Sequence, residues 1–305
     1  MKLCRFAPAP GEPVRLGIVA GEQVRDLSSW LGPDGTLAGM HYPDIAFLQA
    51  LRARPYEGLP SLPLAQVQLL APVLPPSFRD FYAFEAHVRN ARRKRGLPVP
   101  PEWYEAPVFY FSNPAGIFGP DVRVPRPPET RELDYELELA VVIGREGSNI
   151  PSAEADDYVA GFTLLNDWSA RDVQRREMRV GLGPAKGKDF ATTIGPWLTT
   201  PDELDPYVLP DRSRGRRYAL AMEARVNGEC YSVGNSREMH WTFAELIAVA
   251  SRNTTLRVGD LIGSGTVGTG CITEFPEGVH PWLEVGDEVT LQIEALGSLT
   301  NRVSG

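Results

Sequence analysis

The sequence has little cysteine, and this scarcity excludes two classes of small protein. Cys4, Cys230 and Cys271 are the three cysteines in 305 residues, and no two of them have Cys-x-x-Cys spacing. A disulfide-rich scaffold and a structural zinc site both need more cysteines at closer spacing. The composition is typical of a reducing compartment, so we expect a cytoplasmic protein.

The sequence also lacks long apolar runs. The N-terminal segment MKLCRFAPAPGEPVRLG contains no apolar core of signal-peptide length. No segment approaches the roughly 18 consecutive apolar residues that mark a membrane-spanning helix. We therefore expect the protein to have no membrane partner.

Positive charge is in short supply. The chain has 31 Lys and Arg against 39 Asp and Glu, which gives a formal net charge of −8. Proteins that bind nucleic acid place clustered Lys and Arg against phosphates, so we expect no nucleic-acid partner. The basic run at residues 89–95 is typical of a solvated helix face. The sequence also contains no GxGxxG or GxxxxGK[ST] motif, which argues against dinucleotide and P-loop sites.

Glycine and proline are plentiful, at 29 and 28 residues, and their even spread indicates many short strands. Residues 14–19 and 23–27 flank Ala20–Gly21 in the manner of a hairpin. A short helix is predicted at residues 45–53, and the Pro-rich residues 59–76 are interpreted as a linker with one extended segment. We predict a small N-terminal α/β module at residues 1–75 and a main domain at 76–305.

The main domain is predicted to be mostly β with a few helices, in the α+β class. Residues 133–143 alternate apolar and acidic side chains, which is typical of a half-buried strand. Asn227–Gly228 marks a hairpin, because Asn-Gly is the strongest short turn signal. Further strands are predicted at residues 108–111, 158–165 and 289–293, and helices at 170–178, 242–252 and the second half of 80–95.

The sharpest local feature is the pair Glu136 and Glu138. In a strand, two side chains separated by one residue point the same way, with carboxylates roughly 7 Å apart along the strand. Like charges on one face need solvent, basic partners or a cation, and Mg²⁺, Mn²⁺ and Ca²⁺ prefer such oxygen ligands. Two interpretations remain: a solvated outer face, or a site for a hard cation.

Two other aspartates, Asp167 and Asp80, are also candidate site residues. Asp167 follows an apolar strand and precedes a predicted helix, where either Asp167 or Ser169 is a suitable N-cap. Asp80 lies seven residues before His87, one of four histidines in the chain. A histidine near acidic residues suits a general base, although a lone histidine is more often a packed or surface residue.

Taken in chain order, these residues resemble the fumarylacetoacetate hydrolase family. The resemblance is carried by the segments LDYELELAVVIG, LLNDWSARDVQ, GKDF and GDLIGSGT and spans nearly the whole chain. It implies a mixed β-sheet roll or barrel with few helices and a small N-terminal module. The Asp-Phe-Tyr segment, the absence of a glutamate three residues after His87, and the late Glu274 resemble the fumarylacetoacetase branch.

The resemblance implies a divalent cation, usually Mg²⁺, Mn²⁺ or Ca²⁺, of which we expect Mg²⁺. Its ligand positions fall on Glu136, Glu138 and Asp167, with Asp80 as a fourth ligand in the fumarylacetoacetase branch. The cation is expected to chelate the two oxygens of a 1,3-dioxo acid. Family members are commonly homodimers, and the resemblance implies a homodimer here.

The resemblance also implies roles in catalysis. His87, oriented by Glu274, is expected to take a proton from water. Lys188 is expected to support the developing oxyanion, with Arg171 and Gln174 nearby. The residues expected to contact substrate are Tyr82 and Thr266, and one of Arg92, Arg93 and Arg95 could reach a substrate carboxylate.

Each of these positions also has a plain structural interpretation. Lys188 suits a surface lysine, Thr266 belongs to a Gly-Ser-Gly turn, and Arg171 could bridge to Asp167 or Asp172. The leading hypothesis is hydrolysis of a carbon–carbon bond in a small dioxo acid. The alternatives are a decarboxylase, isomerase or hydratase that acts on a 2-oxo-dioic acid of aromatic catabolism with the same site, and a non-catalytic binding protein.

Overall fold

The computed structural model describes residues 1–94 and 96–305. The helices are α1 (Ile45–Arg52), α2 (Glu85–Arg93), α3 (Arg171–Met178), α4 (Phe243–Ala250) and the short 3₁₀ helix η7 (Ile272–Glu274) among others of that kind. The strands of the first half are β1 (Lys2–Ala7), β2 (Arg15–Ala20), β3 (Gln23–Asp26), β4 (Ser61–Pro63), β5 (Gln68–Leu70), β6 (Phe78–Phe81), β7 (Phe109–Ser112), β8 (Ile117–Phe118), β9 (Arg123–Pro125), β10 (Leu133–Asp134), β11 (Leu137–Ile143) and β12 (Gly147–Ser148). Those of the second half are β13 (Val159–Asp167), β14 (Ser169–Ala170), β15 (Thr192–Thr199), β16 (Ala221–Val226), β17 (Glu229–Asn235), β18 (Thr255–Leu256), β19 (Leu261–Gly263), β20 (Glu288–Ile293) and β21 (Gly297–Ser304).

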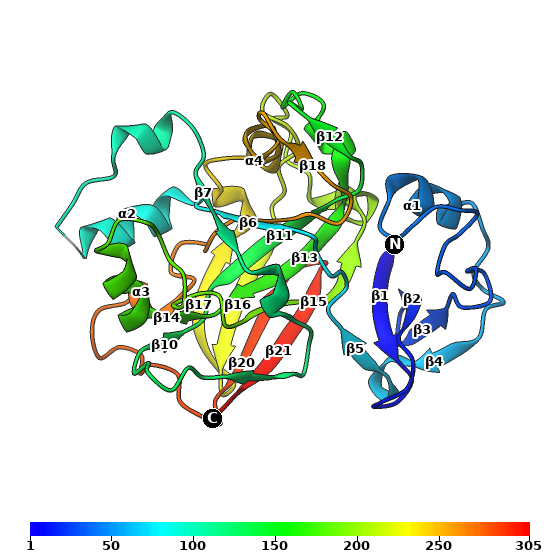
Figure 1. Cartoon of the computed structure of the whole chain (residues 1–305), viewed down its shortest axis with the longest axis horizontal. Helices are drawn as coiled ribbons and strands as arrows, with labels where there is room; N and C mark the ends of the chain where they lie inside the picture. Colours follow the sequence, from blue (N-terminus) through cyan, green and yellow to red (C-terminus); the bar gives the residue numbers. More distant parts are fainter. Residues whose placement is uncertain (95) are drawn as a thin grey trace.

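Two sheets carry most of the strands, and the molecule has the mixed, mostly β architecture of the predicted α+β class. The larger sheet has 12 strands in the order β4-β3-β2-β1-β15-β13-β11-β19-β6-β7, with β5 beside β1 and β8 beside β15. The second sheet has five strands in the order β17-β16-β20-β21-β9. In Figure 1 the strands of this second sheet lie against β11, β13 and β15, and one apolar cluster joins residues of both sheets.

The segment at residues 133–143 corrects the prediction of one half-buried strand. It forms two strands, β10 and β11, with Tyr135 and Glu136 between them, and every residue is buried. Strand β11 has a neighbour on each side, β13 and β19. Leu139 and Val141 pack in one apolar cluster and Ala140 in another. Because both faces of β11 are covered, the alternation of apolar and acidic residues does not mark a solvated face.

The N-terminal segment continues the larger sheet. Strand β1 pairs antiparallel with β15, which aligns Leu3 with Leu198. The predicted linker at residues 59–76 contains β4 and β5, which pair with β3 and β1. In Figure 1, β1 is the blue strand on the side of β15, and β2 and β3 lie beyond it. Residues 59–76 thus contain two short paired strands where one extended segment was predicted, and the domain boundary at residue 75 stays a prediction.

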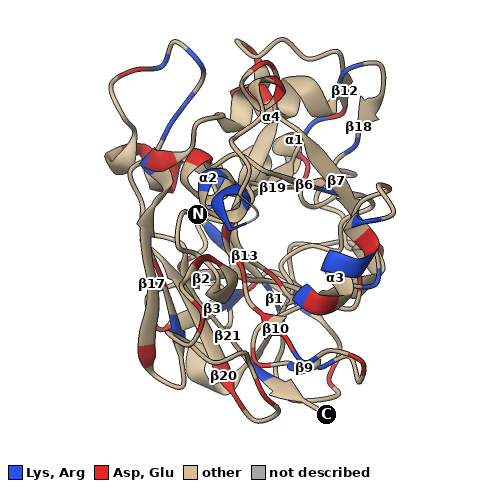
Figure 2. Ribbon diagram, turned by 90° about the vertical axis from the view of Figure 1, so that its left-hand side faces the viewer, with Lys and Arg blue, Asp and Glu red and all other residues tan. Residues whose placement is uncertain are grey.

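Charged helices lie at the surface of the sheet layers. Figure 2 shows Lys and Arg beside Asp and Glu on both α2 and α3, so their charges are mixed. The N-cap of helix α4 is Thr242, whose side chain accepts from the Glu245 N–H while the Glu245 side chain accepts from the Thr242 N–H. This capping box stabilises the first turn. Within the described residues, no helix has the length and apolar character needed to cross a membrane.

Candidate active site

Four carboxylates meet at one end of adjacent strands. Asp80 lies on β6, Glu138 on β11 and Asp167 at the end of β13, while Glu136 immediately precedes β11. The strands β13, β11, β19 and β6 are consecutive in the sheet, so residues distant in sequence become neighbours. All four side chains are buried, which excludes the solvated face that the sequence had left open.

The carboxylates fit a hard divalent cation. Asp80, Glu136 and Asp167 each offer an oxygen within 4.8 Å of the others. Asp80 Oδ1 is buried and finds no hydrogen-bond partner among the described residues. Strand β19 leaves space for this carboxylate, because a Cβ on Gly263 would lie 2.3 Å from Asp80 Oδ1. Buried carboxylate oxygens of this kind are the ligands that Mg²⁺, Mn²⁺ and Ca²⁺ prefer.

Burial and neighbouring negative charges raise the pKa values of the Asp80 and Glu138 carboxyl groups. Burial, followed by the charge of Asp167, raises the pKa of Asp80 well above its ordinary value. Burial and the charge of Asp80 do the same to the pKa of Glu138. Glu138 accepts hydrogen bonds from neutral donors, the Gly265 N–H at 3.1 Å and the Thr266 hydroxyl at 3.2 Å. A cation among these groups would favour their ionised forms.

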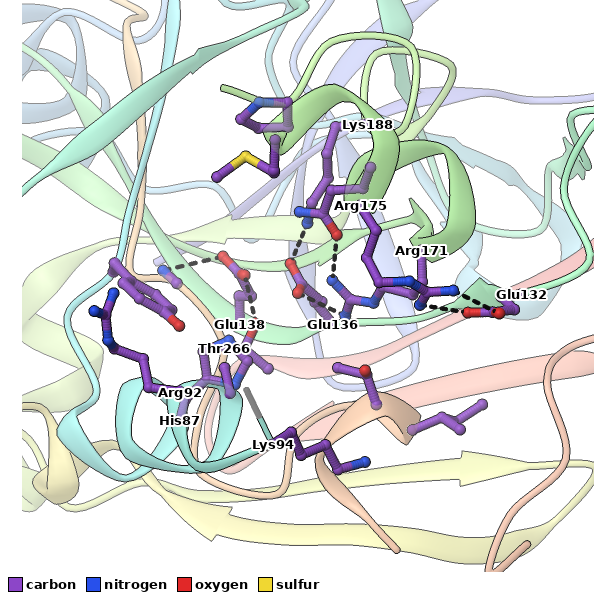
Figure 3. A pocket seen from close by; sticks show the side chains of 18 of the residues that line it. His87, Arg92, Lys94, Glu132, Glu136, Glu138, Arg171, Arg175, Lys188 and Thr266 are labelled. Atoms are coloured by element: carbon purple, nitrogen blue, oxygen red, sulfur yellow. Dashed lines mark hydrogen bonds and ion pairs between the residues drawn. The ribbon is translucent and has the colours of Figure 1, made fainter. Parts of the chain in front are cut away.

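Basic side chains face the other two carboxylates. Lys188 Nζ lies 2.6 Å from Asp167 Oδ2 and also donates to Glu136 Oε2. Burial would raise the pKa of Glu136, but Lys188 and Arg171 outweigh it and hold that pKa well below its ordinary value. Figure 3 shows both basic side chains directed at Glu136. Lys188 is 4% exposed, so the interpretation as a surface lysine is wrong.

His87 and Glu274 form a buried pair. His87 Nδ1 lies 2.6 Å from Glu274 Oε1. The Asn90 side chain and the Thr269 N–H donate to the other oxygen, at 2.8 and 3.0 Å. Burial would raise the pKa of Glu274, but the His87 ring outweighs it and holds the pKa below its ordinary value. The Cys271 thiol, 3.5 Å from Glu274 Oε1, completes this buried group.

Arg171 joins two acidic residues rather than the partners suggested by the sequence. Its Nε donates to Asp134 Oδ2 at 2.8 Å and its Nη2 to Glu136 Oε1 at 2.8 Å. Its Nη1 donates to Gln174 Oε1 at 3.1 Å, which places Gln174 beside the guanidinium. Asp172 instead accepts from Thr130. The suggested bridges to Asp167 or Asp172 are therefore wrong.

The residues at the start of α3 also correct a prediction. The N-cap residue is Ala170, whose side chain makes no capping hydrogen bond. Ser169 Oγ donates to the Asp167 carbonyl at 3.0 Å. The Asp167 carboxylate accepts from Lys188 and from the Tyr110 hydroxyl. The side chain of Asp167 is therefore directed into the site and does not cap α3.

A cavity of about 700 Å³ opens over these groups. Its lining includes the predicted substrate contacts Tyr82 and Thr266, and the His87 ring meets the Tyr82 ring edge-on at 5.2 Å. Arg92 and Lys94 line the cavity as well (Figure 3), whereas Arg93 lies outside the lining. Arg95 lies outside the described residues.

The sequence missed two residues of this site. Tyr110, on β7, lines the cavity and donates to Asp167 Oδ2. Asp134 is fully buried beneath Arg171, and burial raises its pKa although the guanidinium opposes this. Tyr110 stands in an aromatic strand with no acidic neighbour, so its sequence carries no signal. Asp134 had a signal, since it stands two residues before Glu136 in the same alternating segment, but the sequence analysis gave it no role of its own.

The chain matches two protein-family models and is similar to known proteins. The family model "Fumarylacetoacetate (FAA) hydrolase C-terminal" matches residues 77–304, and the model "Rv2993c-like, N-terminal" matches residues 1–72. The mitochondrial oxaloacetate tautomerase FAHD2A of Homo sapiens is 37% identical over 249 residues, which cover 80% of this chain and 72% of that protein.

Several solved structures cover all of this chain, and two of them illustrate the range of activities. A 5-carboxymethyl-2-hydroxymuconate delta-isomerase from Mycobacterium smegmatis superposes with a TM-score of 0.70 at 29% identity and is 99% covered. A maleylpyruvate hydrolase from Sphingobium superposes with a TM-score of 0.71 at 26% identity and is also 99% covered. The relatives thus include a tautomerase, an isomerase and a hydrolase. The chain belongs to the fumarylacetoacetate hydrolase family of enzymes.

Proposed function

We propose that this protein is a divalent-cation-dependent enzyme of small 2-oxo acids, and that it hydrolyses a carbon–carbon bond in a 1,3-dioxo acid. The observation that carries the proposal is the 2.6 Å contact between His87 Nδ1 and Glu274 Oε1 beside the carboxylate cluster. A histidine whose second nitrogen is held by a carboxylate is a general base with a fixed tautomer.

The base pair supports the activation of water. With Nδ1–H donating to Glu274, the neutral ring keeps its basic lone pair on Nε2, and His87 lines the cavity. His87 would take a proton from water as the oxygen attacks a substrate carbonyl carbon. The bond between that carbon and the neighbouring methylene then breaks, its electron pair stays with the methylene carbon, and this carbon takes the proton from the His87 imidazolium. Glu274 stabilises the imidazolium that forms.

The cation is expected to be Mg²⁺, held by Asp80, Glu136, Glu138 and Asp167. Bound there, it would supply Lewis-acid polarisation of the substrate oxygens. Lys188 and Arg171 add positive charge beside Glu136. Buried cations of this kind favour negative charge that develops on the substrate. Gln174 keeps the Arg171 guanidinium in place.

The mouth of the cavity suits an anionic substrate. Arg92 and Lys94 line the cavity, where Arg92 Nε donates to the Pro98 carbonyl oxygen and Lys94 Nζ to the Phe275 carbonyl oxygen. A carbonyl group leaves the positive charge of each side chain uncompensated. We propose that Arg92 binds a substrate carboxylate, which selects it over Arg93.

Keto–enol tautomerisation of an oxo dicarboxylic acid is the second candidate. It is favoured by the 37% identity to the human oxaloacetate tautomerase. The same base serves it, because His87 could take a proton from the carbon next to a carbonyl and the substrate oxygen could receive one. In that reaction no water is consumed and no carbon–carbon bond breaks.

The test is product formation by the purified protein from acetylpyruvate, fumarylacetoacetate and oxaloacetate, with Mg²⁺ and with EDTA. Mg²⁺-dependent release of pyruvate or fumarate supports hydrolysis. Mg²⁺-dependent interconversion of keto and enol oxaloacetate, without cleavage of the other two acids, replaces hydrolysis with tautomerisation. Absence of activity on all three acids overturns both proposals for these substrates.

Two histidine variants complete the experiment. His87→Ala is expected to abolish whichever reaction is observed. His41→Ala is the matched control, since His41 is exposed and outside the cavity lining. Equal activity of both variants would remove His87 from the mechanism.

A further inference from the structure

Asp134 is a buried carboxylate that the proposed reaction does not use. It ends β10 with a relative exposure of 0%. Its Oδ1 accepts from the N–H groups of Tyr135 and Ile272, at 2.9 and 2.8 Å. Its Oδ2 accepts from Thr273 N–H at 3.1 Å and from Arg171 Nε at 2.8 Å. All of these partners are donors, so the geometry requires the ionised carboxylate.

One side of Asp134 holds the positive charge beside the carboxylate cluster. Arg171 uses Nε for Asp134 and Nη2 for Glu136 Oε1. The guanidinium is planar, so fixing Nε fixes the direction in which Nη2 points. Without Asp134, the same cation would be drawn to Glu136 alone. The position of Arg171 over Glu136 therefore depends on Asp134.

The other side of Asp134 holds the turn that carries the partner of His87. Ile272 and Thr273 are the first two residues of η7, and Glu274 is the third. No side chain of the η7 segment itself caps this turn. Asp134 receives both N–H groups instead, from a strand more than a hundred residues earlier. The position of Glu274 therefore depends on the same carboxylate as that of Arg171.

We propose that Asp134 is the positioning residue that holds Arg171 and the His87–Glu274 pair in register with each other. The proposal rests on the proposed function, in which the base and the basic charge act on one substrate. Asp134 does not line the cavity and acts through the residues that do. Its role is to keep the proton-accepting side of the site at a fixed distance from the cation side.

The substitution Asp134→Asn tests this with little change in volume. An amide has one accepting oxygen and one donating nitrogen, whereas both oxygens of Asp134 face two N–H donors. Either orientation of the amide places its NH₂ group against two donors. Arg171 and η7 must then move apart. A misplacement of about 1 Å is expected to lower kcat by about 100-fold, with a much smaller change in KM.

Asp172→Asn is the matched control. Asp172 neighbours Arg171 in sequence, yet its carboxylate accepts from Thr130 Oγ1 at 2.6 Å and Arg131 N–H at 2.8 Å. It lies outside the cavity lining. Asp172→Asn is expected to keep the wild-type kcat. If Asp134→Asn does not fold, Asp134→Glu against Asp172→Glu makes the same comparison, because the extra methylene displaces the charge.

A second readout does not depend on activity. The chain has four histidines, so the ring N–H signals are few enough to assign by NMR. The Nδ1 proton of His87, shared with Glu274, is expected far downfield in the wild type and in the Asp172 variant. It is expected to shift or vanish in the Asp134 variant. A structural role alone would lower the melting temperature without changing this signal in the folded protein.

The outcomes separate the two proposals. Wild-type kcat together with an unchanged His87 signal in Asp134→Asn overturns the positioning role. A lower melting temperature with wild-type kcat per folded molecule overturns it as well. Inactivity of the wild type on all three oxo acids defeats the proposed function only, since the His87 signal still decides whether Asp134 positions Glu274.

Discussion

Glu136 and Glu138 are separated by one residue, yet the pKa values of their carboxyl groups are shifted in opposite directions. Glu136 faces Lys188 and Arg171, so its pKa falls below the ordinary value despite burial. Glu138 faces Asp80 and neutral donors, so its pKa is well above the ordinary value. The spacing in sequence is the same for any Glu-x-Glu strand. The difference comes from the neighbours, which are Asp80 on β6, Lys188 in the turn before β15 and Arg171 on α3.

Lys188 competes with a divalent cation for the same oxygens. Its ammonium contacts Asp167 and Glu136, two of the expected ligands. Lys188→Ala is therefore expected to strengthen Mn²⁺ binding by about tenfold or more, because like charges a few ångströms apart in a buried site repel by more than about 1.4 kcal/mol. Titration calorimetry with Mn²⁺ measures this change.

The control for that measurement is Lys186→Ala. Lys186 stands two residues before Lys188 in the sequence. Its side chain is exposed and pairs with Asp189. Its removal should leave Mn²⁺ affinity unchanged, while Lys188→Ala loses activity as it gains affinity. Weaker Mn²⁺ binding in Lys188→Ala would show that the lysine orients the carboxylates rather than competing for them.

Glu274 makes stability depend on acid pH. Its pKa is held below the ordinary value against burial, chiefly by the His87 ring. A lowered folded-state pKa stabilises the protein above the unfolded value of about 4.3, and this contribution is lost as pH falls through the folded pKa. The difference in unfolding free energy between wild type and Glu274→Gln is therefore expected to shrink below about pH 4.3. Urea denaturation across this pH range measures it; a constant difference would contradict the assignment.

At the scale of elements, the site depends on a close approach of three strands. Strand β19 pairs with β11 on one side and with β6 on the other. Gly263 on β19 aligns with Asp80 on β6. A Cβ there would lie 2.3 Å from Asp80 Oδ1 and 3.3 Å from Glu138 Oε2. The glycine thus provides the space in which both carboxylates sit.

Gly263→Ala is expected to displace Asp80 and to weaken cation binding. Overpacking of a buried site typically costs about 1–3 kcal/mol, and a similar loss in cation affinity is about 10- to 100-fold. Mn²⁺ titration and thermal unfolding measure the two effects. Gly58→Ala is the control, because nothing lies within 4 Å of a Cβ at that position. Wild-type Mn²⁺ affinity in Gly263→Ala would remove Asp80 from the ligand set.

Elements with local signals were predictable from the sequence. The Asn227–Gly228 turn joins β16 to β17, with φ of 50° and 82° at the two residues. Asn and Gly tolerate these positive values, which explains why the pair marks a hairpin. The helix at residues 242–252 was predicted from its apolar periodicity, and its start carries a capping box at Thr242. In both cases the information lies within a few residues.

Features set by distant neighbours were not predictable. The break between β10 and β11 at Tyr135–Glu136 has no local turn residue. At this break the Asp134 side chain accepts a hydrogen bond from η7, and the Glu136 side chain pairs with Lys188. Both partners are more than fifty residues away in sequence. The family resemblance supplied the residues of the cation site and the base. It supplied neither Asp134 nor Tyr110, because their roles depend on contacts.

At the scale of the whole molecule, the N-terminal segment and the main sheet share an apolar core. One cluster contains Leu3 and Phe47 together with Ala140, Leu198 and Leu261. The N-terminal amine of Met1 also contacts the acidic side chains of residues 202 and 203. The predicted division at residue 75 therefore separates segments that bury each other's apolar surface.

This shared core predicts that the chain unfolds in one cooperative step. Scanning calorimetry in EDTA should give a single transition whose calorimetric and van't Hoff enthalpies agree. Leu3 is fully buried. Leu3→Ala should lower the free energy of unfolding by about 2–5 kcal/mol and move the single transition to lower temperature without splitting it. Two resolved transitions, of which Leu3→Ala moves only one, would show instead that residues 1–75 fold independently. In that case the β1–β15 pairing would be a docking contact between two modules, and removal of the first module would leave the carboxylate cluster intact.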